Sequence, residues 1–198
     1  MRKIIPFIVF ILLNVLFTSA QNIIDADTKM ARQLVSDNSA TIGIPVEILN
    51  SAIVSSTFED PATHIRYVYL QQTYMDIAVH NQMQVFSFRN GKMLSNSGNF
   101  DPAIVKLVST GSFMPSVSAE SAVQSALSDR GMHPTQMAIA LNRKDNGRFV
   151  EFSNMGVSKE NITAKLNWMP NEKTKKYDLA WQVYVIPKTT PDYWLVQV

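Results

Sequence analysis

The dipeptide Asn90-Gly91 is the feature that most constrains how this chain can fold. It separates two strand-like runs, 82–89 and 92–95. In the first run the side chains alternate between two faces, with Met83, Val85 and Ser87 on one and Gln84, Phe86 and Phe88 on the other. The two-residue turn that joins such strands needs positive φ at both positions, which Asn and Gly tolerate well. The sequence therefore predicts a β-hairpin over residues 82–99.

Similar strand patterns lie on both sides of this hairpin. The predicted strands are 52–58, 64–73, 137–141, 148–152, 162–168, 179–186 and 193–198. Within 64–73, Ile65, Tyr67 and Tyr69 share one face, and Arg66, Val68 and Leu70 share the other. The turn residues Asp145-Asn146-Gly147 are expected to join 137–141 to 148–152.

Helices are predicted ahead of each group of strands. Residues 25–37 carry an apolar stripe of Met30, Leu34 and Val35, and a short helical turn is expected at 46–49. A second helix is expected over 118–131, where Ser118 serves as the N-cap and Gly131 as the stop. The apolar face of this helix consists of Ala122, Val123, Ala126 and Leu127.

This order of elements predicts an α+β fold with two small modules. Each module is expected to be a helix packed on a curved antiparallel sheet, as in cystatin-like folds. The polar, turn-rich stretch 109–118 is interpreted as the junction, which places the modules at 21–112 and 113–198.

The first twenty residues are typical of a secretory signal peptide. Arg2 and Lys3 precede an apolar run from Ile4 to Phe17, and small residues follow it. The chain is therefore expected to be secreted or periplasmic. It has no cysteine, so its stability must come from its apolar core. Removal of the leader leaves sixteen basic and sixteen acidic residues, which favours neither a nucleic-acid partner nor stable membrane association.

No motif for catalysis or metal binding occurs in the sequence. His64, His80 and His133 are too far apart for a helical zinc pair, and no His-Glu-x-x-His or Gly-x-Ser-x-Gly is present. We therefore expect no catalytic, cofactor-binding or metal-binding residues in this chain. The carboxylates Glu59-Asp60 are interpreted as a solvated turn. Three tryptophans, Trp168, Trp181 and Trp194, are expected to fill a core between sheet and helix.

The central hairpin region resembles the propeptide motif of fungalysin/thermolysin-type precursors, the FTP domain. The resemblance covers 63–73, 76–81 and 90–95, and its most specific part is Leu70-Gln71-Gln72. The residues that match the family motif here are Tyr69, Leu70, Gln71, Gln72, Val79, Asn81, Gly91 and Lys92. Asp76-Ile77-Ala78 stands where the family pattern has Gly-Ile-Pro.

The second half resembles the PepSY-like module that precedes the catalytic domain of fungalysins. This match rests on 166–170, on 179–185 with Trp181, and on 193–198 with Trp194. The chain ends where the family's Asp-Ala turn begins. The resemblance implies a non-catalytic proregion that acts as an intramolecular chaperone and steric inhibitor of a secreted zinc metallopeptidase. Its implied partner is the cognate catalytic domain, and zinc is expected only in that domain.

Two alternative functions remain open at this point. A stand-alone secreted peptidase inhibitor or binding protein of cystatin-like fold would have the same pattern of elements. An enzyme of unfamiliar design would need two of the histidines, or a pair of carboxylates, to converge in a cleft.

Overall fold

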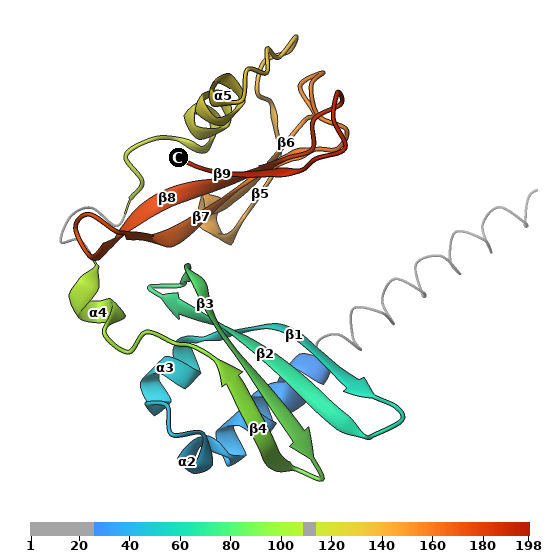
Figure 1. Ribbon diagram of the computed structural model, residues 1–198, viewed down its shortest axis with the longest axis vertical. Helices are drawn as coiled ribbons and strands as arrows, with labels where there is room; N and C mark the ends of the chain where they lie inside the picture. The colour runs from blue at the N-terminus through green and yellow to red at the C-terminus, as the bar shows by residue number, and fades with distance from the viewer. Residues whose placement is uncertain (1–25, 109–113) are drawn as a thin grey trace, which may run out of the picture. The chain divides into compact units, whose positions relative to one another are not determined.

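The computed structural model describes residues 26–108 and 114–198 and has an α+β fold (Figure 1). Its nine strands are β1 (Ile53–Asp60), β2 (Ile65–Tyr74), β3 (Ile77–Arg89), β4 (Lys92–Gly98), β5 (Ala140–Lys144), β6 (Phe149–Phe152), β7 (Ile162–Asn171), β8 (Lys176–Val185) and β9 (Trp194–Gln197). Helical segments cover 26–37, α2 (Ser39–Ile42), α3 (Val46–Ser51), α4 (Ile104–Leu107), α5 (Ala119–Asp129) and the 3-10 turn η1 (Asp145–Gly147). The expected leader, 1–20, and part of the expected junction lie outside the described residues.

The strands form one mixed sheet, and the chain divides into two compact units. The order β1-β2-β3-β7-β6-β5 runs through the sheet, β4 pairs with β3, and β8 pairs with both β7 and β9. The first unit contains 26–72 and 82–100 of the described chain, and the second contains 73–81, 101–108 and 114–198. Strands β2 and β3 contribute to both units, since the hairpin turn between them belongs to the second.

The first unit packs its helical segments on one face of strands β1 to β4 (Figure 1). The predicted alternation of side chains is confirmed, because Val68, Leu70, Phe86 and Phe88 are all buried on this face. The remaining buried members of the cluster are Ala31, Val35, Ile42, Leu49, Ala52 and Phe100. Burial of this apolar area is the main source of the unit's stability.

The first helix buries a stripe that differs in part from the predicted one. Ala31 and Val35, one turn apart, are buried, and Leu34 packs beside them. Met30 was expected in the stripe, but its side chain is 51% exposed. Leu34 and Val35 belong to both stripes, and the buried stripe has Ala31 in place of Met30.

The predicted Asn-Gly hairpin is confirmed between β3 and β4. Asn90 and Gly91 have φ of 52° and 77°, and Arg89 is paired with Lys92 directly across the turn. The Asn38 side chain binds this hairpin, since its amide nitrogen donates to the Gly91 carbonyl oxygen at 2.9 Å and its amide oxygen accepts from the Met93 N–H at 3.0 Å. These bonds connect the helical segments to the strand ends within the first unit.

In the second unit, α5 packs on strands β7 and β8. The predicted N-cap is confirmed, because the Ser118 hydroxyl accepts the Ser121 N–H at 3.1 Å. The predicted apolar face is also buried, and all four of its members have no exposed surface: Ala122, Val123, Ala126 and Leu127. They meet the alternating face of β7, which consists of Ile162, Ala164, Leu166 and Trp168.

One expectation about strand pairing was wrong, and one predicted strand has different bounds. The sheet is not wholly antiparallel, because β3 pairs with β7 in parallel through Ala78↔Asn167 and Val79↔Trp168. Alternation assigns a residue to a face, but it carries no information on which strand lies beside it or in which direction. The predicted pairing across Asp145-Asn146-Gly147 is confirmed, because β5 pairs antiparallel with β6, but the first strand is Ala140–Lys144 in place of 137–141.

We predict that Leu70→Ala lowers the free energy of unfolding by about 2–5 kcal/mol, because it removes a fully buried side chain from the core of the first unit. The control Ile53→Ala, on a side chain that is 45% exposed, should cost about 0.5 kcal/mol or less. Urea denaturation followed by tryptophan fluorescence and far-UV circular dichroism measures both. Equal losses in the two variants would contradict this description of the core.

Candidate functional site

In the first unit, the face of strands β1 to β4 opposite the helices carries an aromatic cluster. Phe58 on β1 pairs in register with Tyr67 on β2, and their rings stack with centroids 5.1 Å apart and planes 26° apart. Tyr69 extends the stack, since its ring lies 6.2 Å from that of Phe58. Alternation along the two strands fixes this arrangement, because Val68 and Leu70 point to the opposite, buried face.

Further apolar side chains lie on the same face of β1 and β3. We call the whole surface the aromatic face and define it by Ile53, Phe58, Tyr67, Tyr69, Met83 and Val85. Phe58 is 48% exposed, Ile53 45% and Met83 36%. Exposed apolar side chains that are contiguous mark interaction sites more often than single ones do.

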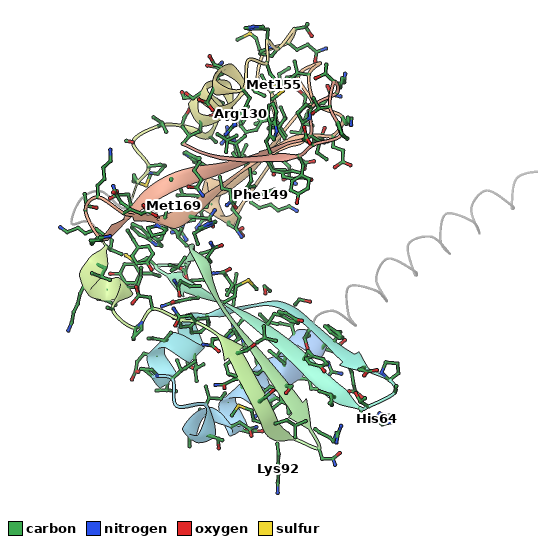
Figure 2. All side chains as sticks on the ribbon, viewed as in Figure 1. His64, Lys92, Arg130, Phe149, Met155 and Met169 are labelled. Atoms are coloured by element: carbon green, nitrogen blue, oxygen red, sulfur yellow. The ribbon has the colours of Figure 1, made fainter. Side chains whose placement is uncertain are left out.

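The centre of the aromatic face carries no charge. Its polar neighbours are neutral, among them Gln71 and the hydroxyls of Ser87 and Ser95, whose oxygens lie 2.8 Å apart. Charged side chains lie at one end of the sheet, where Glu59 and Asp60 precede the β1–β2 turn that carries His64 and Lys92 follows the β3–β4 turn (Figure 2). Depletion of charge around aromatic residues is typical of the core of a protein–protein interface.

The carboxylates at that end have structural partners. The Thr63 hydroxyl donates to Asp60 at 2.6 Å and the Ala62 N–H donates at 3.0 Å, and these bonds lower the pKa of the Asp60 carboxyl. Glu59 accepts from Arg66 at 3.2 Å. Each carboxylate therefore stabilises a turn or an ion pair, and the two do not converge on a common site.

The family-motif residues of the first half hold the β2–β3 hairpin together. Leu70 and Gln72 are fully buried, and so is Val79. The Gln71 side-chain amide donates to the Gln82 carbonyl oxygen at 2.8 Å. Asn81 has a φ of 58°, at the boundary between the parts of β3 that belong to each unit. Tyr69 alone among these residues contributes to the aromatic face.

Asp76 has a backbone conformation that glycine adopts most easily. It is one of two turn residues between β2 and β3, Met75 and Asp76, and their φ values are 51° and 59°. Glycine adopts this left-handed region without the steric cost that a Cβ imposes.

The motif tryptophans of the second half have core roles. Trp181 is buried, and its indole N–H donates to the Val117 carbonyl oxygen at 2.9 Å. Trp194 packs at the margin of the same core, and the Arg130 guanidinium carbon lies 5.5 Å from the centroid of its ring. Gly91 and Lys92 lie in the β3–β4 turn described above. The motif residues thus lie in cores, turns and strands of the fold, and the structure does not gather them in one pocket.

The histidines are separate from one another. Within 26–108 and 114–198, no three His, Asp or Glu side chains gather closely enough to hold a metal ion. His64 is largely exposed beside Glu59, at 3.5 Å. His80 is partly buried, its Nδ1 lies 3.4 Å from Gln182 Nε2, and burial lowers the pKa of its imidazole.

None of the helices in the described ranges has the length and apolar character needed to cross a bilayer.

Comparison with models of protein families and with curated proteins finds no match for this chain. The candidate site therefore rests on geometry. Sequence patterns assigned Tyr67 and Tyr69 to one face but did not identify that face as a site. The signal was present, since an aromatic strand residue on an exposed face has no core to fill. Recognising it required the pairing of β1 with β2, which brings Phe58 to the two tyrosines.

We predict that the turn at Asp76 prefers glycine. Asp76→Ala should be less stable than Asp76→Gly by about 1 kcal/mol, because alanine keeps the Cβ and lacks the short polar side chain that helps aspartate in this conformation. Thermal and urea denaturation of the two variants measure the difference. Equal stabilities would contradict the left-handed conformation at this position.

We also predict that His80 makes the stability depend on pH. Because its pKa is lowered in the folded state from the usual 6.5, the unfolded chain binds the proton more readily. The free energy of unfolding should therefore fall as the pH drops from 6.5 through the lowered pKa, and His80→Gln should remove this part of the loss. Denaturant titrations at about pH 7.5 and about pH 5 compare the two proteins. An identical loss in both would contradict the prediction.

Proposed function

We propose that this chain is the non-catalytic proregion of a secreted fungalysin-type zinc metallopeptidase. In this proposal it assists the folding of the catalytic domain and blocks it sterically until it is cleaved. The proposal also treats the chain as two cystatin-like modules, each a helix backing a curved sheet. One observation carries it: the first-half residues that resemble the propeptide pattern lie in a helix-backed sheet whose other face is aromatic and uncharged at its centre.

The motif residues support the proposal through the turn that they surround. The pattern of the resembled family has a glycine where Asp76 stands, and Asp76 has the φ of 59° that glycine favours. The adjacent Leu70, Gln72 and Val79 are fully buried. A positive φ at this turn is therefore compatible with the glycine of the family pattern, and this supports the proposal.

The aromatic face has the chemistry expected of a surface that holds a protein partner. Tyr, Phe and Met are enriched in the cores of interfaces, and truncation of a central aromatic residue commonly costs more than 1 kcal/mol of binding. Phe58, Tyr67 and Tyr69 present such rings on a sheet that is packed firmly from behind. A preorganised surface loses little entropy when the partner docks.

Binding of this kind explains both activities that a proregion needs. A surface that binds the native peptidase and not its unfolded chain stabilises the native state by mass action. The same bound surface covers the partner and keeps substrates away, so inhibition requires no reacting group in the proregion. Zinc belongs to the catalytic domain in this proposal, and export accounts for the leader-like first twenty residues.

A stand-alone secreted inhibitor is the second candidate. The specific observation in its favour is the architecture itself, because a helix packed on a curved sheet is also the plan of cystatin-like inhibitors. The two candidates differ in partner. A proregion is selective for its own metallopeptidase, whereas a free-standing inhibitor acts on other peptidases as well.

The test is inhibition in trans. The purified chain should bind a fungalysin-type catalytic domain from the same organism, slow its hydrolysis of a peptide substrate and raise the yield when that domain is refolded. The double variant Phe58→Ser/Tyr67→Ser should weaken inhibition at least about tenfold, which corresponds to about 1.4 kcal/mol.

Val46→Ser is the matched control for this experiment. Its side chain is 49% exposed on α3, on the helical side of the same unit, so the change should leave inhibition unaltered. Absence of both binding and inhibition would refute the proregion. Equal inhibition of unrelated cysteine or serine peptidases would favour the free-standing inhibitor instead.

A further inference from the structure

Strand β9 differs from the other edge strands of the described chain. Within the described ranges four strands pair on one side only, β1, β4, β5 and β9. The first three each contain a bulge and at least one charged residue. Bulges and charges are the devices by which proteins protect an edge from further pairing. Strand β9, Trp194-Leu195-Val196-Gln197, has a regular register with β8 and contains neither a charge nor a proline.

The outward backbone groups of β9 are free to pair. Trp181 and Val198 exchange both of their backbone hydrogen bonds, at 2.8 and 2.9 Å. Because hydrogen-bonded pairs alternate along an antiparallel ladder, Val196 and Trp194 also face β8 with their N–H and C=O groups. The N–H and C=O groups of Leu195 and Gln197 therefore point away from the sheet, and β9 has no second neighbour in the described chain.

A groove lies beside this edge, with α5 as its wall. Its volume is about 570 Å³, and it is lined by Ser125, Ala126, Asp129 and Arg130 of the helix region and by 195–198 of the strand region. Arg130, at the end of α5 (Figure 2), pairs with Asp129 at 3.3 Å and lies over the Trp194 ring. Since these two side chains pair with each other, they add no net charge to the lining.

We propose that this groove binds an extended, uncharged peptide segment of a partner protein, which joins the sheet as a strand beside β9. The segment would exchange up to four backbone hydrogen bonds with Leu195 and Gln197, and every second side chain would face α5. Strand addition of this kind takes its affinity from the main chain and its selectivity from the pockets of alternate side chains. The two charged side chains of the lining, Asp129 and Arg130, are already paired with each other, so a charged side chain of the segment would lose solvation without gaining a partner.

A second copy of this chain fits the groove less well than a free segment. The side chains that a second β9 would turn toward the helical side are those of Trp194 and Val196. Val196 is already buried in its own core, and Trp194 is already held under its own Arg130. A second copy would therefore satisfy the backbone edge but leave the groove unfilled, whereas a free segment brings side chains of its own.

This inference stands apart from the proposed function. It concerns the second unit, and it uses neither the aromatic face nor the identity of a peptidase. Failure of inhibition in trans would leave it intact, and failure of the experiment below would leave the proregion proposal intact.

The experiment uses the whole chain labelled with nitrogen-15 and a blocked pentapeptide, acetyl-Thr-Val-Thr-Val-Thr-amide. Titration should shift the amide resonances of Leu195, Gln197 and the facing residues of α5, and should slow amide exchange at Leu195 and Gln197. Gln197→Pro removes one outward N–H and should weaken binding at least about tenfold, because a proline cannot donate to a ladder. Gln197→Ala keeps that N–H and is the matched control, expected to bind like the unmodified chain.

A second arm needs no variant. The same peptide methylated at every backbone nitrogen cannot donate to the edge and should not bind, and a Glu-Val-Glu-Val-Glu peptide should bind at least about tenfold more weakly than the neutral one. Three results would overturn the inference: no shift at Leu195 and Gln197, equal weakening by Gln197→Ala and Gln197→Pro, or equal binding of the methylated peptide. Sedimentation that shows dimers of the chain lost in Gln197→Pro would also overturn it, by assigning the edge to a second copy.

Discussion

The structure depends on how one hairpin turn is anchored in the core of the second unit. The Trp168 indole N–H donates to the Tyr74 carbonyl oxygen at 2.9 Å, and the two rings lie 5.9 Å apart. Ile77 and Val79 are buried in the same core, and Val79 is paired in parallel with Trp168. The turn belongs to β2 and β3, so the strands that it joins supply the core of the first unit as well. Each long strand thus serves two cores along its length.

Local structure in this chain could be predicted from the sequence because local rules decide it. The Asn90-Gly91 turn needs positive φ, and the Ser118 hydroxyl binds an N–H group at the start of a helix. The alternation at Val68 and Leu70 separates a buried face of the strand from an exposed one. These features depend on residues close together in the chain, and the physical demand at each position is narrow.

Pairing between distant segments could not be predicted in the same way. The parallel contact of Ala78 with Asn167 joins residues far apart in sequence, and no periodicity encodes which partner a strand selects. The aromatic face was missed for the same reason, because Phe58 meets Tyr67 only after β1 and β2 have paired. Met30 shows the corresponding limit for helix prediction, because Met30 and Ala31 both have helical spacing to Leu34 or Val35 and the sequence does not decide which of them is buried. The absence of catalytic residues stays a prediction of the sequence.

The division of residues between the two units has a consequence for proteolysis. The chain passes between the units at 72/73, 81/82 and 100/101, so neither unit is a single continuous stretch of polypeptide. A cut near residue 100 leaves a C-terminal fragment that lacks Ile77 and Val79, both of which its core requires. The N-terminal fragment keeps those two side chains but has lost the core that buried them. A single cleavage would therefore separate Ile77 and Val79 from the core that buries them. Both fragments would expose apolar surface, which makes each of them a substrate for further proteolysis.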